Sequence, residues 1–161
     1  AAGAFLIILQ PFRVGQFVTA GGVTGTGKEI GIFVTAVDTA DNVRTIIPNS
    51  KVFADTIQNF STNPYRRVDL VAQLNHGVDP RDAGFRLKER LAKIHNVLPD
   101  PAPEVEILTF TLAGPVLAVR PYCSNAHYWQ VYFDTNRAIR EAFGEAGYPA
   151  PEQHLAVRGG L

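Results

Sequence analysis

The chain has 161 residues, of which 46% are apolar, and its 15 lysine and arginine residues balance 15 aspartate and glutamate residues. This length accommodates one or two small domains with a packed core. A formal net charge of zero argues against general nucleic-acid binding, which needs clustered positive charge. The single cysteine, Cys123, excludes an internal disulfide framework and fits a reducing compartment.

Residues 1–9 form an uncharged apolar run, AAGAFLIIL. This run is too short to cross a bilayer alone, because a transmembrane helix needs about 20 apolar residues. It also lacks the basic start of a signal peptide. Two interpretations stay open: a core segment, or the cut end of a transmembrane helix whose small residues allow close helix packing. The chain contains no methionine, even at residue 1, which favours a fragment.

Pro11 is expected to end this first segment, because proline lacks the amide hydrogen that a helix interior requires. Short strands follow, and the alternation of Ile30, Ile32 and Val34 is typical of a strand with one covered face. About five strands are expected, and they predict a small barrel. Their expected positions are 16–20, 23–28, from 30 onward, 43–47 and 52–60, with turns at Gly21-Gly22, at 40–42 and at Pro48-Asn49.

The segment 61–64 is the expected domain boundary, and the pattern changes after it. Asp79-Pro80 is a typical helix start, with an acceptor side chain at the cap and proline at the first helical position. The expected order is strand, helix, strand, strand, helix, which is that of a ferredoxin-like domain. The elements are a strand at 68–74, a helix from 80, a hairpin of 105–112 with 116–120, and a second helix that is capped by Ser124 or Asn125 and ends near Gly147. A last strand is expected at 154–158.

Residues 22–28, GVTGTGK, have the spacing of a phosphate-binding loop. The next residue should be serine or threonine, but it is Glu29, and the loop should open a helix, whereas the following residues are strand-like. Glycines that ease the bends of a barrel are therefore the favoured interpretation.

Few residues suggest reactive chemistry. The four histidines, at 76, 95, 127 and 154, never fall at a metal-ligand spacing, and ordinary surface positions are expected for them. Cys123 has His127 four residues on, and such a pair can activate a thiolate, although a half-buried thiol is the simpler interpretation. Arg66, Arg67 and Asp69 form either a solvated strand entrance or a charged lining that biases ion passage.

Several motifs together resemble one known family. The residues that carry the resemblance are Pro11–Val18, Gly21–Gly25, Thr39–Asp41, Ile47–Ser50, Asn59–Ser61, Pro64–Arg67 and the segment from Tyr132 to Pro149. They run in the order found in small-conductance mechanosensitive channels and cover essentially the whole chain. The chain is therefore identified, by resemblance, as a member of that family.

The resemblance implies an α+β fold and a function in conduction rather than catalysis, with no cofactor, no metal and no nucleic-acid partner. Members are homo-heptameric channels of the bacterial inner membrane that open under bilayer tension. They release ions and small solutes during hypoosmotic shock. Their soluble parts form a cytoplasmic chamber with side portals.

The resemblance also assigns segments. Residues 1–11 would be the end of the pore-lining transmembrane helix, with Ala1, Gly3 and Ala4 lining the pore and contacting the bilayer region. Residues 12–62 would be an Sm-like β domain, 63–151 a ferredoxin-like domain, and 152–161 a strand of a barrel shared between subunits. Arg66, Arg67 and Asp69 would line the portals, and Pro48-Asn49 would be a family turn.

Two other hypotheses remain at this point. An Sm-like unit joined to a ferredoxin-like unit is also compatible with a module that binds RNA or a small ligand, although fold alone is weak support for function. An enzyme that uses Cys123 and His127 is the third hypothesis. Because the tension-sensing helices of the family precede residue 1, this segment by itself is not expected to sense tension.

Overall fold

The computed structural model describes residues 2–160, apart from the side chains of residues 5 and 6. The chain divides into two compact units, Ala1–Pro64 and Tyr65–Leu161. Each unit has its own buried core. The two units are therefore described separately.

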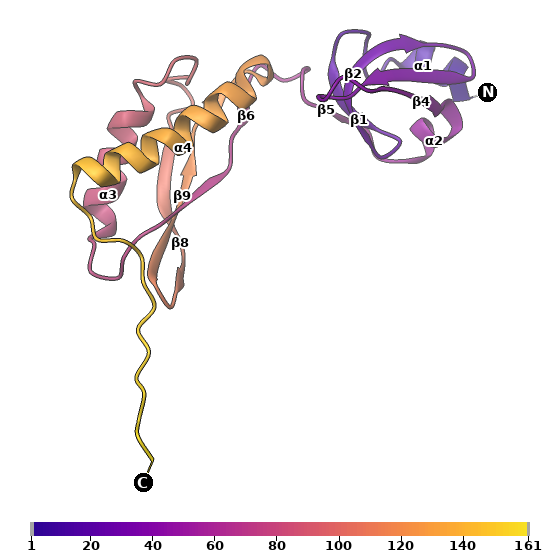
Figure 1. Cartoon of the computed structure of the whole chain (residues 1–161). Coiled ribbons are helices and arrows are strands. Elements are labelled where there is room, and N and C mark those ends of the chain that lie inside the picture. Colours follow the sequence, from indigo (N-terminus) through magenta and orange to yellow (C-terminus); the bar gives the residue numbers. More distant parts are fainter. Residues whose placement is uncertain (1, 161) are drawn as a thin grey trace. The chain divides into compact units, whose positions relative to one another are not determined.

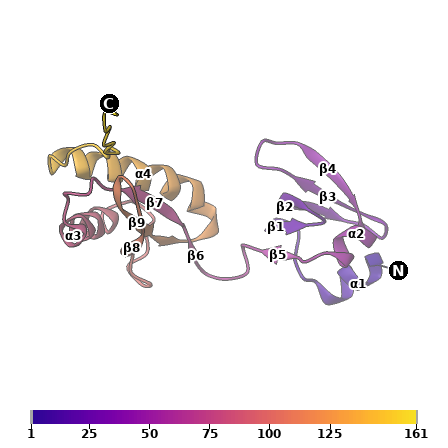
Figure 2. The same ribbon diagram turned by 90° about the horizontal axis from the view of Figure 1, so that it is seen from below.

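The first unit is a five-stranded antiparallel sheet with two short helices (Figures 1 and 2). The strand order is β4-β3-β2-β1-β5. Its core contains Phe12, Val18, Val37, Ile47 and Val52. The elements are α1 (Ala2–Leu9), β1 (Phe17–Ala20), β2 (Val23–Ile30), β3 (Val34–Asp38), β4 (Arg44–Pro48), α2 (Asn49–Ala54) and β5 (Gln58–Asn59).

Two expectations for this unit were wrong. The alternation at Ile30, Ile32 and Val34 does not mark one strand, because β2 ends at Ile30, a bend follows, and Ile32 is 61% exposed. In the predicted strand at 52–60, residues 52–54 belong to the helix α2, and only β5 is a strand, which pairs with β1. The helix forms here because Asn49 and Val52, three residues apart, share its buried face.

The second unit has the predicted order of elements, and the α+β class is confirmed. Its three-stranded antiparallel sheet has the order β7-β9-β8, and β10 pairs with β6 in a separate ladder. The helices α3 and α4 contact each other, α3 packs on β8 and β9, and α4 packs on β7 (Figure 1). The elements are β6 (Arg66–Arg67), β7 (Leu70–Gln73), α3 (Pro80–Leu91), β8 (Glu104–Thr111), β9 (Gly114–Arg120), β10 (Tyr122–Cys123), a 3-10 turn (Asn125–His127) and α4 (Tyr128–Glu145).

Most of the helix start and end signals in the sequence of the second unit give the predicted structure. Asp79 caps α3 by accepting a hydrogen bond of 2.9 Å from the backbone N of Arg81. Gly147 has a φ of 70° just after α4, the left-handed conformation that commonly ends a helix. The predicted cap of α4 was wrong, because the side chain of Ser124 makes no capping bond and the 3-10 turn precedes the helix instead.

The segment after α4 forms neither helix nor strand in residues 149–160 of this chain (Figure 1). The pattern-based expectation of a final strand inside the chain's own sheet was therefore wrong. The segment is attached at its start, where Asn75 Nδ2 donates a 3.0 Å hydrogen bond to Ala150 O. A strand shared between subunits remains a prediction.

Tyr148 provides a test of packing at the end of α4. Burial, together with a hydrogen bond to the Asp82 carboxylate, raises the pKa of Tyr148 to about 12. The folded state therefore holds this proton more tightly than the unfolded state, whose tyrosine titrates near pH 10. We expect this contribution to stability to be complete below about pH 10 and to be lost as the pH rises to about 12.

Urea unfolding between pH 9 and pH 12 measures this loss, and Tyr148→Phe should show a flatter decline than the parent chain. The exposed Tyr65 supplies the matched control, since Tyr65→Phe should keep the parent's slope. Equal slopes for the parent and Tyr148→Phe would contradict the assignment.

Candidate functional site

The first helix meets the sheet of its own unit at a very close contact. Gly3 is buried, and a Cβ atom at this position would lie 1.6 Å from the carbonyl oxygen of Ile32. Only glycine allows this approach between α1 and the bend at 31–33. Ala4, also predicted to line a pore, is exposed, and Ala1 lies outside the described residues.

The bend that receives Gly3 is held by Asn49, half of the predicted Pro48-Asn49 turn. Asn49 is 1% exposed, and its Nδ2 donates a 2.7 Å hydrogen bond to Gly31 O. Its backbone N donates to Phe33 O at 2.8 Å, and its Oδ1 accepts from Thr35 Oγ1 at 2.6 Å. Pro48 ends β4 directly before α2. This motif therefore fixes the surface on which α1 packs, rather than forming a simple turn.

A second contact brings together motifs that are far apart in the sequence. Asn59 Nδ2 donates to Pro11 O at 3.2 Å and to Gln16 Oε1 at 2.9 Å. The backbone N of Phe17 donates to Ser61 Oγ at 2.9 Å. The chain leaving α1 is thus bonded to the last strand of the same unit, and two of the family motifs have a shared structural role.

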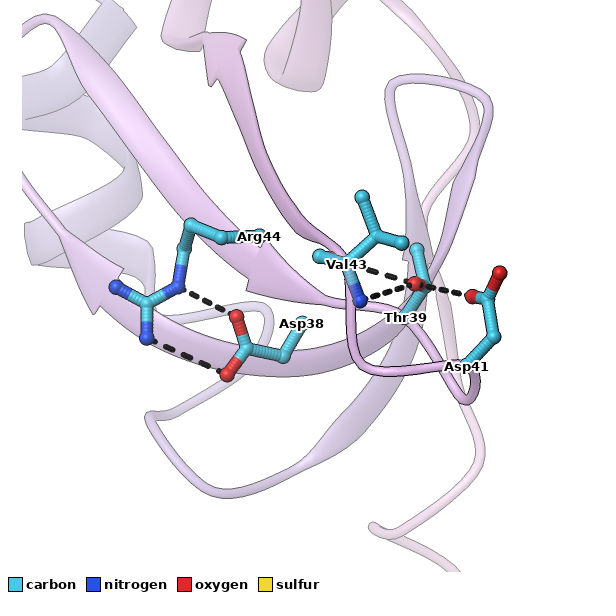
Figure 3. A network of polar contacts seen from close by, with 5 residues as sticks. All are labelled: Asp38, Thr39, Asp41, Val43 and Arg44. Atoms are coloured by element: carbon cyan, nitrogen blue, oxygen red, sulfur yellow. Dashed lines mark hydrogen bonds and ion pairs between the residues drawn. The ribbon is translucent and has the colours of Figure 1, made fainter.

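The Thr39–Asp41 motif closes the β3–β4 turn (Figure 3). Thr39 Oγ1 donates to Asp41 Oδ1 at 2.5 Å and accepts from Val43 N at 3.0 Å. At the mouth of the turn, Arg44 donates to both carboxylate oxygens of Asp38. Hydrogen bonding to this guanidinium lowers the pKa of Asp38. The side chains of this turn are therefore hydrogen-bonded to one another and to the turn's own backbone.

In the second unit, Arg67 and Asp69 belong to an exposed charged chain. Arg67 Nε donates to Asp69 Oδ1 at 2.6 Å, and Arg120 Nε lies 3.7 Å from the same oxygen. Tyr122 Oη donates to Glu104 at 3.0 Å, which with burial raises the pKa of Tyr122. Sequence reasoning missed Arg120, because only the β9 register brings this distant residue to Asp69.

Arg66 points elsewhere. Its guanidinium lies 3.9 Å from the centroid of the Tyr128 ring, and its Nη1 donates to Asn125 Oδ1 at 2.9 Å. Arg66 therefore ties β6 to the start of α4, whereas Arg67 and Asp69 remain exposed. The three residues that were predicted to act together are divided between a structural contact and a surface charge.

The other candidates for chemistry fit structural roles. The GVTGTGK segment runs through a turn into β2, so no helix N-terminus faces it. Cys123 is fully buried, and its burial raises the pKa of the thiol, which disfavours the reactive thiolate.

Within residues 2–160, no three histidine, cysteine or acidic side chains are grouped as a ready metal site. No helix in the described part of the chain is long and apolar enough to span a membrane.

The Cys123 environment yields a direct expectation. In the native chain, a disulfide reagent such as DTNB at pH 8 should label Cys123 at least about tenfold more slowly than in the urea-unfolded chain, because the thiol is buried and protonated. Absorbance at 412 nm follows the reaction. Equal rates in both states would show that the thiol is accessible and would restore Cys123 as a candidate nucleophile.

Comparison with known proteins gives these motifs a context. Residues 1–62 match the beta-domain of mechanosensitive ion channels, and residues 68–149 match the C-terminal domain of the mechanosensitive ion channel MscS. This chain belongs to the MscS family of mechanosensitive ion channels. The resemblance inferred from the motifs is thereby confirmed.

Individual relatives of this chain also carry the names of mechanosensitive channels. The chain is 34% identical over 157 residues to a small-conductance mechanosensitive channel of Edwardsiella ictaluri. This alignment covers 96% of this chain and 55% of the relative. It is 28% identical over 155 residues to the large-conductance mechanosensitive channel MscMJLR of Methanocaldococcus jannaschii, covering 91% of this chain and 43% of that protein. The chain thus spans about half the length of the curated relatives it matches.

Solved structures of MscS-type channels support the fold. The closed state of Helicobacter pylori MscS superposes with a TM-score of 0.89 at 20% identity, covering 99% of this chain and 64% of that chain. Arabidopsis thaliana MSL1 superposes with a TM-score of 0.69 at 20% identity, covering 91% of this chain and 55% of that chain. The names of the two curated relatives describe mechanosensitive channels.

Proposed function

We propose that this chain forms the pore exit and cytoplasmic vestibule of a small-conductance ion channel that opens under membrane tension. The channel releases ions and small solutes during hypoosmotic shock. The observation that carries the proposal is the family membership along both units, together with family motifs that fix the end of an apolar helix to the β domain. In this role α1 is the last part of the pore-lining helix, with Ala1 and Ala4 at the pore, whereas Gly3, also predicted to line the pore, instead faces the bend at 31–33.

The surface of each unit supports assembly into a homo-oligomer, for which we propose seven copies. Phe33 is 78% exposed on the first unit, and Leu112 is 83% exposed on the second. Large apolar side chains with this exposure are typical of surfaces that a neighbouring chain covers. The segment 152–161, with Leu155 and Val157 almost fully exposed, would form one strand of a barrel shared by all subunits.

The proposed location is the bacterial inner membrane, with both units on the cytoplasmic side and α1 leading into the bilayer. Arg67, Asp69 and Arg120 would lie at the side portals, where fixed charges bias the passage of ions. Because Arg66 is engaged with Tyr128, the exposed Arg67 should have the larger influence on permeating ions. The alternative of an RNA-binding or ligand-binding module rests on fold alone and gains no support from the relatives' names.

Osmotic survival tests the proposal. A bacterium that lacks its own mechanosensitive channels should survive a sudden downshock when it expresses the full-length gene that encodes this chain. Patches of its membrane should show currents that are activated by suction. Failure of both protection and suction-activated current, with the protein present in the membrane at normal levels, would refute the proposal.

Charge reversal tests the portal assignment separately. Arg67→Glu should shift the reversal potential in a salt gradient toward cation preference. Arg140→Glu, which makes the same change at an exposed position of α4, is the matched control and should shift it less. Equal shifts would assign the effect to overall charge rather than to a portal.

A further inference from the structure

The most distinctive unassigned feature of the second unit is a pair of histidines that lie far apart in the sequence. His76 follows β7, and His154 lies in the extended segment after α4. Their Nε2 atoms are 3.1 Å apart. Glu152 Oε1 lies 3.3 Å from His154 Nε2. Two imidazoles therefore meet at one exposed place, and a carboxylate lies beside one of them.

We propose that His76 and His154 bind a divalent transition-metal cation such as Zn²⁺, with Glu152 as a third ligand and water completing the coordination. Two ligand atoms bound to one tetrahedral Zn²⁺ at about 2.0–2.1 Å are about 3.3 Å apart. The separations of 3.1 Å and 3.3 Å match this edge length. Imidazole nitrogen and carboxylate oxygen are ordinary ligands of zinc, and this donor set disfavours Ca²⁺, which requires six to eight oxygens.

The two imidazole rings meet at a steep angle. The ring centroids are only 4.8 Å apart, and the ring planes are inclined by 83°. Each centroid lies behind its nitrogen, so rings pointing head-on with nitrogens 3.1 Å apart would have more distant centroids. The two rings are therefore tilted rather than head-on, and because both side chains are exposed they can turn so that both Nε2 lone pairs face one cation. Binding requires both rings to carry their proton on Nδ1, the tautomer common in zinc ligands.

The supporting residues hold the two histidines in place. Asn75 is 6% exposed, its Oδ1 accepts from Gly77 N at 2.8 Å, and its Nδ2 donates to Ala150 O at 3.0 Å. One buried amide thus fixes both the loop that carries His76 and the start of the segment that carries His154. On its other side, the backbone of His76 packs against Gly114, where a Cβ would lie 2.5 Å from His76 N.

Glu152 completes the set by a small movement. The Glu152 side chain is 63% exposed, so it can change its rotamer without disturbing a packed core. This rotation is needed because the three groups are not yet arranged as a ready three-ligand site. A bound cation would fasten the last segment of the chain to the α/β unit, next to the point at which the segment leaves it.

Zinc titration of the full chain tests this inference, and the chain must be purified without a polyhistidine tag. Isothermal calorimetry should detect one Zn²⁺ site per chain, and excess Ca²⁺ should not compete. His76→Ala and His154→Ala should each weaken binding by about tenfold or more, and Glu152→Gln should weaken it less. In the NMR spectrum, Zn²⁺ should shift the imidazole signals of two of the four histidines.

The remaining histidines provide matched controls. His95→Ala and His127→Ala remove exposed imidazoles elsewhere in the same unit and should leave zinc affinity unchanged. The proposal is overturned if these variants lose binding as much as His76→Ala does, or if His76→Ala and His154→Ala bind Zn²⁺ like the parent chain. An absence of Zn²⁺ binding by the parent at millimolar concentration would also overturn it. None of these results depends on channel activity, so they are distinguishable from failure of the proposed function.

Discussion

Replacing Gly3 by alanine is expected to release α1 from the sheet of the first unit. The added Cβ would lie 1.6 Å from Ile32 O, a backbone atom that Asn49 holds in place through the neighbouring residues. An eight-residue helix is not stable alone in water, so loss of this contact should also unfold it. Amide hydrogen exchange of residues 7–9 should become faster by about tenfold or more, equivalent to about 1.4 kcal/mol or more.

Gly144 offers a matched glycine-to-alanine control. It lies in α4, and a Cβ there would meet nothing within 4 Å. Gly144→Ala should leave the exchange of residues 7–9 unchanged and stabilise α4 by about 0.5–1 kcal/mol, because alanine is the better helix former. If Gly3→Ala kept the parent's exchange rates, the close contact with Ile32 would be disproved. In the full-length channel, the same variant should alter gating, since it changes how the proposed pore helix joins the β domain.

Asn49→Ala should strongly destabilise the first unit. The substitution removes two side-chain hydrogen bonds and leaves Gly31 O and Thr35 Oγ1 without these partners in a buried environment. We expect a loss of about 2–4 kcal/mol in the free energy of unfolding, because unsatisfied buried polar groups add to the lost bonds. Chemical unfolding, followed by hydrogen exchange within β2 and β3, measures this loss.

Two further variants sharpen the test. Asn63→Ala removes an exposed asparagine and should change stability by less than about 0.5 kcal/mol. Asn49→Asp keeps an acceptor for Thr35 but loses the donor to Gly31 O, so it should be destabilising as well. A stable Asn49→Asp variant would indicate that the Gly31 hydrogen bond contributes little.

The sequence allowed prediction of those elements whose signals are local. The cap at Asp79, the break at Pro11 and the helix end at Gly147 were recognisable from single residues, and the structure confirms them. The helix α2 was missed because Val52 and Phe53 favour strands, whereas the burial of Asn49 against Gly31 decides the conformation. That hydrogen bond joins residues 18 positions apart, so no local pattern reveals it.

In the candidate site, too, local features could be predicted and long-range contacts could not. Arg66, Arg67 and Asp69 were selected because they are adjacent in sequence, but strand pairing turns Arg66 toward Tyr128 and brings Arg120 to Asp69. The contact between His76 and His154 spans 78 positions and was likewise invisible in the sequence. Their meeting depends on where the chain runs after α4, which spacing rules for metal ligands on one helix do not address.

The sheet order β7-β9-β8 also constrains the order in which the second unit can fold. Its hairpin, β8 with β9, closes a short loop and can form early, on the microsecond timescale typical of hairpins. Pairing of Leu70 with Val119 must close a much longer loop, so β7 should dock late and limit the folding rate. Because β7 is synthesised before β8 and β9, it first waits without a partner, and the edge of β9 then stays unpaired until β7 docks. Until then the free edges of β7 and β9 can mispair with another copy of the chain.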